Sequence, residues 1–66
     1  MKLIVNGETK EFSKPLTLEQ LIQELGVRKE TVVAEVNRAI VPMEQRASLG
    51  LNEGDQIELI QFVGGG

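Results

Sequence analysis

The chain has 66 residues, of which 41% are hydrophobic and 26% are charged, a composition that predicts a single small globular domain. Its formal net charge is −3, it contains neither cysteine nor histidine, and it has no basic cluster. Disulfides, thiolate chemistry and histidine-based catalysis or metal binding are therefore excluded, and nucleic-acid binding has little support.

The first twelve residues predict a β-hairpin. Residues 2–5 are an apolar run, and Asn6-Gly7 follows, which favours a type I′ turn because both central residues of that turn need a positive φ. Residues 8–12 are mostly polar, so the returning strand belongs at an edge of the sheet or has one wet face. Alternation places Leu3 and Val5 on the core face and Ile4 on the opposite face.

The next segment predicts one amphipathic helix. Thr17 is a good N-cap, and Gln20 at the third helical position completes a capping box. Gly26 ends the helix in the C′ position. The apolar residues between them have the spacing of one helical face: Leu18, Leu21, Ile22 and Leu25.

The second half of the chain predicts three more strands. Residues 31–36 read as an internal strand, Asn37-Arg38 as a turn, and Ile40-Val41 as a very short edge strand that ends at Pro42. Residues 43–48 are expected to be irregular or a single helical turn. Residues 52–55 are predicted to form a turn, and residues 56–62 the last strand.

This order of elements predicts an α+β fold. A hairpin, one helix and a second group of strands can close one core in so short a chain only if the helix lies across one face of a mixed sheet of about five strands. We therefore predict a β-grasp (ubiquitin-like) domain over residues 1–63, with the first and last strands parallel and adjacent in the middle of the sheet. No apolar stretch approaches the ~20 residues of a transmembrane helix, and no signal-peptide core is present, so we expect a cytoplasmic protein.

The last strand is apolar on both faces. Ile57 and Leu59 share the face expected to meet the core, whereas Ile60 and Phe62 share the other. With a helix on one side of the sheet only, Ile60 and Phe62 should be exposed, together with Ile4. Exposed apolar groups of this kind mark a partner-binding surface, to which Val63 also belongs.

Three glycines, Gly64, Gly65 and Gly66, follow the last strand. Glycine loses more conformational entropy on ordering than any other residue, so residues 64–66 are expected to be a flexible tail. Fully extended, three residues span about 10 Å, which allows a terminal carboxylate to pass through a slot too narrow for side chains.

These segments resemble the ubiquitin-like sulfur carriers of the ThiS and MoaD type, most closely the thiamin-biosynthesis branch of that family. The resemblance covers the whole chain. The hairpin signal Val5-Asn6-Gly7 is unspecific by itself, and Val36-Asn37 followed by Ile40-Val41-Pro42 is a further matching piece. The specific parts are the segment from Leu51 through Gly54-Asp55 to Glu58 and the ending from Gln61-Phe62-Val63 to Gly66, at their mutual spacing.

The resemblance implies a carrier rather than an enzyme. In such a carrier, an E1-like adenylyltransferase of the ThiF type uses ATP and Mg²⁺ to adenylate the carboxylate of Gly66. Sulfur mobilised by a cysteine desulfurase converts it to a thiocarboxylate, and a thiazole synthase of the ThiG type accepts that sulfur. No permanently bound cofactor or metal and no catalytic side chain are expected, and the scattered carboxylates form no constellation: Glu35, Glu44, Glu53 and Glu58.

Two other interpretations stay open. The small subunit of molybdopterin synthase has the same fold and Gly-Gly end, but such chains are usually longer and often carry a Pro-Pro pair where this chain has Gln61-Phe62-Val63. A ubiquitin-like domain that binds partners without carrying sulfur is also possible, because β-grasp folds host many functions. Such a domain has no need of a free glycine terminus.

Overall fold

The computed structural model describes residues 1–62. Within that part, five strands, one α-helix and one 3₁₀ helix follow one another: β1 (Lys2–Val5), β2 (Glu8–Glu11), α1 (Leu18–Glu24), β3 (Val32–Val36), β4 (Ala39–Ile40), η1 (Met43–Gln45) and β5 (Gln56–Gln61). None of these helices has the length and apolar character needed to cross a bilayer.

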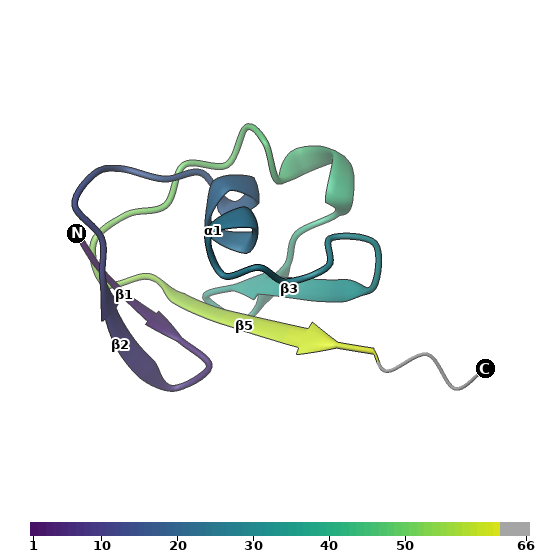
Figure 1. Ribbon diagram of the computed structural model, residues 1–66, viewed down its shortest axis with the longest axis horizontal. Coiled ribbons are helices and arrows are strands. Elements are labelled where there is room, and N and C mark those ends of the chain that lie inside the picture. Colours follow the sequence, from purple (N-terminus) through teal and green to yellow (C-terminus); the bar gives the residue numbers. More distant parts are fainter. Residues whose placement is uncertain (63–66) are drawn as a thin grey trace.

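The strands form one mixed sheet in the order β2-β1-β5-β3-β4. β1 and β5 run parallel, with Val5 level with Ile57, and every other neighbouring pair is antiparallel. Figure 1 shows α1, η1 and their connections on one side of this sheet. The predicted β-grasp is therefore confirmed, including the parallel pair of first and last strands.

The hairpin between β1 and β2 has the predicted turn. Asn6 and Gly7 have φ values of 49° and 83°, as a type I′ turn requires. Leu3 and Val5 are buried on the helix side, and β2 lies at the edge of the sheet, as its polar sequence predicts.

Helix α1 begins with the predicted capping box. The Gln20 N–H donates to Thr17 Oγ1 at 3.1 Å, and the Thr17 N–H donates to Gln20 Oε1 at 2.9 Å. Gly26 follows the helix with a φ of 70°, a left-handed conformation that favours glycine.

The core fills the space between α1 and the sheet. Its buried apolar residues come from β1, α1, β3 and β5 and from the connections between elements: Leu3, Val5, Leu16, Leu18, Leu21, Ile22, Val32, Ala34, Val41, Leu51 and Ile57. Leu49 and Leu59 are partly buried and pack against this cluster. Leu49 and Leu51 thereby anchor the β4–β5 connection to the core.

The short strand β4 differs from its prediction by one residue. It comprises Ala39–Ile40 rather than Ile40-Val41. The Val41 N–H still donates to Ala34 O at 2.9 Å, but the Val41 side chain is buried in the core, and Pro42 ends the segment as predicted.

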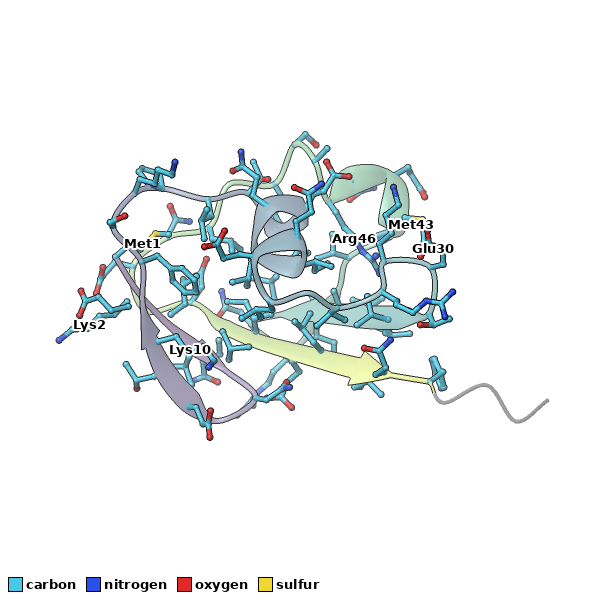
Figure 2. All side chains as sticks on the ribbon, viewed as in Figure 1. Met1, Lys2, Lys10, Glu30, Met43 and Arg46 are labelled. Atoms are coloured by element: carbon cyan, nitrogen blue, oxygen red, sulfur yellow. The ribbon has the colours of Figure 1, made fainter. Side chains whose placement is uncertain are left out.

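The long connection from β4 to β5 contains the one charged residue that is buried in the described chain, Arg46, which is 5% exposed. Its guanidinium donates to Val32 O at 2.6 Å and to Lys29 O at 3.1 Å. In Figure 2, Arg46 lies between η1 and the start of β3, and Met43 lies farther out on the surface.

Candidate functional site

The candidate site is the exposed face of the sheet together with the end of β5. The end of β5 is held at the edge of β3 by Thr31. The Phe62 N–H donates to Thr31 O at 3.0 Å, and the Gln61 side-chain amide donates to Thr31 Oγ1 at 2.8 Å. Gly66 comes four positions after Phe62 in the sequence. The predicted partner contact Val63 and the predicted tail, residues 64–66, lie outside the described residues.

The sheet face away from α1 carries large exposed apolar side chains. Ile60 is 46% exposed and Phe62 is 61% exposed, which confirms that both are on the surface. Alternation from the buried Ile57 places both side chains on the face opposite the core. Across the ladder, Ile60 lies level with Val33, which is half-buried.

Ile40 extends this surface towards the edge strand, although its exposure was not predicted. It is 67% exposed and lies level with Glu35, on the same face as Ile60. A signal for it existed in the sequence, because Val41 is a core residue and its neighbour in an extended segment must point the other way. Ile40 is two strands away from Ile60, with Glu35 between them, so we call only Ile60 and Phe62 the outer apolar patch.

Ile4 is on the same face but does not adjoin the patch. It lies level with Gln56, four residues before Ile60 along β5, so about 13 Å separates the two positions. Its side chain is also half-buried rather than exposed. The expectation that Ile4 is exposed together with Ile60 and Phe62 is therefore wrong in this respect.

Two carboxylates lie within the same face. Glu35 of β3 is directly opposite Glu58 of β5, and like charges at opposite positions of a ladder repel each other. Neither belongs to the ion pairs found in residues 1–62, which join the N-terminal amine to Glu11 and Lys10 to Glu8. The face therefore presents an apolar patch beside an acidic pair, a combination that fits a partner surface with apolar and basic groups.

Among residues 1–62, the helix side has depressions but no group of reactive side chains gathered in one place. One hollow of about 380 Å³ is lined by residues that include Phe12, Lys14 and Glu24. A smaller one of about 80 Å³ lies beside Arg46 and Met43. Within residues 1–62 no three carboxylates are grouped as metal ligands.

Comparisons with known proteins agree on one family. A model of the ThiS family matches residues 3–66. The sulfur carrier protein ThiS of Escherichia coli is 32% identical to this chain over 66 residues, which is the full length of both. A crystal structure of a thiamine biosynthesis protein (ThiS) from Geobacter metallireducens superposes with a TM-score of 0.87 at 30% identity, covering 100% of both chains.

A further relative is much longer than this chain. A thiazole synthase of Paramagnetospirillum magneticum is 46% identical over 66 residues. The match covers 100% of this chain but only 20% of that protein.

Proposed function

Because the chain belongs to the ThiS family, we propose that it is a sulfur carrier protein of thiamin biosynthesis. The observation that carries this proposal is the match to the family over residues 3–66, which includes Gly66 and is accompanied by an alignment along the whole length of a named sulfur carrier protein.

The proposed chemistry takes place at the carboxyl group of Gly66. A carboxylate oxygen attacks the α-phosphorus of ATP, pyrophosphate leaves, and an acyl-adenylate forms. A sulfur nucleophile then attacks the acyl carbon, and AMP leaves. If this sulfur is hydrosulfide, the product is the thiocarboxylate itself; if it is a persulfide, the product is an acyl disulfide, from which a thiol reductant supplies the two electrons that release the thiocarboxylate. ATP and Mg²⁺ belong to the activating enzyme, of the ThiF type, and the sulfur comes from a cysteine desulfurase in the cytoplasm.

The composition of the chain fits a carrier whose chemistry is performed by its partner enzymes. A carrier needs no acid, base or metal ligand of its own, and this chain has neither cysteine nor histidine. What it supplies is a surface for recognition and a carboxylate at the end of a glycine segment. Once the domain has docked, delivery of that carboxylate is effectively intramolecular, which lowers the entropic part of the barrier.

The proposed sulfur acceptor is a thiazole synthase of the ThiG type. Support comes from the relative named thiazole synthase, in which a segment similar to this chain makes up a fifth of one long polypeptide. A carrier and its acceptor that work together gain effective concentration when they are joined in one chain. The outer apolar patch and the acidic pair beside it supply a docking surface for such a partner.

The proposal is tested by ATP–pyrophosphate exchange with the cognate adenylyltransferase. Three chains are compared: one that ends at Gly66, one that lacks Gly65 and Gly66, and one with a single residue added after Gly66. Deletion withdraws the carboxylate by roughly 7 Å, and errors of about 1 Å already cost orders of magnitude in rate. We expect exchange with the first chain alone.

Binding and thermal unfolding are the controls for this comparison. The shortened chain should bind the enzyme and unfold at the same temperature as the intact one, because the core and the outer face are untouched. Exchange by the shortened chain at the intact rate would contradict the proposal and leave a partner-binding domain as the better explanation.

A further inference from the structure

The support that β1 gives to β5 ends early. The two strands pair only at Ile4–Gln56 and Val5–Ile57, whereas β5 continues to Gln61. The last backbone contact from this side is the Asn6 N–H, which donates to Ile57 O at 2.9 Å. Beyond it, β1 turns away into the hairpin, because Asn6 adopts a φ of 49°.

The side chain of Asn6 continues the pairing where the main chain stops. The Leu59 N–H donates to Asn6 Oδ1 at 2.8 Å, and Asn6 Nδ2 donates back to Leu59 O at 3.4 Å. A carboxamide has the donor and the acceptor of a peptide group, so it can replace the next peptide of a strand. Asn6 therefore acts both as a turn residue and as an additional rung of the β1–β5 ladder.

This rung lies close to the place where β5 leaves the sheet. On the β3 side, the last contact is the Phe62 N–H to Thr31 O bond, and on the β1 side it is the contact of Asn6 with Leu59. Between them, these two contacts hold both edges of the four-residue segment from Leu59 to Phe62. Without Asn6, the strand after Ile57 would be held from one side only.

We propose that Asn6 is a positioning residue for the segment that carries Gly66. Resting on the proposed function, this inference gives the side chain a role in the rate of adenylation, without contact with the reacting atoms. Its two hydrogen bonds with Leu59 fix the end of β5, which is the point from which the chain continues towards Gly66. A fixed origin should raise the frequency with which the carboxylate reaches the attacking geometry, which tolerates errors of only about 1 Å.

Asn6→Gly separates this role from the role in the turn. Glycine adopts a positive φ without strain, so the type I′ turn is retained while both side-chain hydrogen bonds are lost. Asn37→Gly is a closely matched control. Asn37 also has a positive φ, of 51°, and its side chain also makes two hydrogen bonds at β5, with the Gln56 N–H and Asp55 Oδ1, both at 3.0 Å. Those bonds hold the start of β5 rather than its end.

Two measurements test the inference. In Asn6→Gly, hydrogen exchange of the Leu59 amide should become faster, whereas Asn37→Gly should leave that amide protected. In ATP–pyrophosphate exchange, Asn6→Gly should lower kcat about tenfold with KM changed less than about twofold, because the docking face is intact while the carboxylate is misplaced. Asn37→Gly should leave both constants unchanged.

The outcomes separate this inference from the proposed function. If the intact chain supports exchange and Asn6→Gly does so at the same kcat, the positioning role is overturned and the sulfur-carrier function stands. An equal loss of kcat in Asn37→Gly would overturn it as well, since the effect would then be one of general stability. If the intact chain supports no exchange at all, the proposed function and this inference both fail.

Discussion

Phe62 is one of only two aromatic residues in the chain. The other, Phe12, packs against the core, whereas Phe62 is 61% exposed at the end of β5. Aromatic side chains are enriched among the few residues that carry most of the energy of an interface. Phe62 is thus the residue of the outer apolar patch from which the largest contribution to docking is expected.

Replacement of this side chain tests the docking surface. Phe62→Ala should weaken binding to the adenylyltransferase by about 2 kcal/mol or more, measured by calorimetry, with the melting temperature nearly unchanged. Met43→Ala is the control, because Met43 is also a large exposed apolar residue, 50% exposed, but belongs to η1 on the helix side. Equal losses in both variants would argue against a docking site on the outer face.

At the scale of single residues, the sequence predicts conformation better than contact. The pair Asn6-Gly7 predicts its turn because the φ requirement is local. The contact of Asn6 with Leu59 joins residues 53 positions apart, so the sequence around either residue does not predict it. The same is true of Ile4, whose half-buried state depends on which side chains neighbour it across the sheet.

At the scale of elements, Arg46 connects three parts of the fold. Its guanidinium holds Lys29 O before β3 and Val32 O at the start of β3, and its main-chain oxygen accepts the Glu19 N–H of α1 at 3.1 Å. Charged residues are rarely so deeply buried. The sequence offered no sign of this role, because Arg46 stands among polar residues in a segment without periodicity.

Removal of the guanidinium should therefore destabilise the domain. Arg46→Met keeps most of the side-chain volume but leaves two carbonyl groups without their donor, which we expect to cost about 1 to 3 kcal/mol of unfolding free energy. Urea denaturation measures this difference. Arg28→Met, at an exposed position of the α1–β3 connection next to Lys29, should change the midpoint little. If the urea midpoint of Arg46→Met were as high as that of the parent chain, Arg46 would not stabilise the fold by connecting these parts.

The elements themselves were largely predictable. The capping box set the start of α1, and the glycine after it set its end, because both are signals of local chemistry. The short strand β4 was placed one residue late, since a two-residue strand is defined by its partner, here β3, rather than by its own pattern. The outer position of Ile60 and Phe62 followed from strand alternation alone.

At the scale of the whole molecule, stability depends on a small core with β5 at its centre. A domain of 66 residues has about 3 to 10 kcal/mol of unfolding free energy at ~0.05–0.15 kcal/mol per residue. Ile57 is fully buried in β5, between β1 and β3. One cavity at this position can therefore remove a large share of the total.

Ile57→Ala should cost about 2 to 5 kcal/mol, and thermal unfolding followed by circular dichroism should show a markedly lower midpoint. Ile60→Ala supplies the comparison within the same strand, because it removes the same atoms from the exposed face. Its midpoint should stay close to that of the parent chain. Similar losses in both variants would mean that the outer face contributes to the core as much as the inner face does.

The parallel course of β1 and β5 also decides how the molecule can be attached to a surface. Met1 precedes β1, its amine donates to Phe12 O at 2.7 Å, and the chain start lies at the opposite end of the sheet from the end of β5 (Figure 1). A biotin or affinity tag placed before Met1 would thus tether the domain by the end remote from Phe62. On a biosensor chip this orientation would turn Phe62 and the end of β5 towards the solution, where a partner protein can reach them.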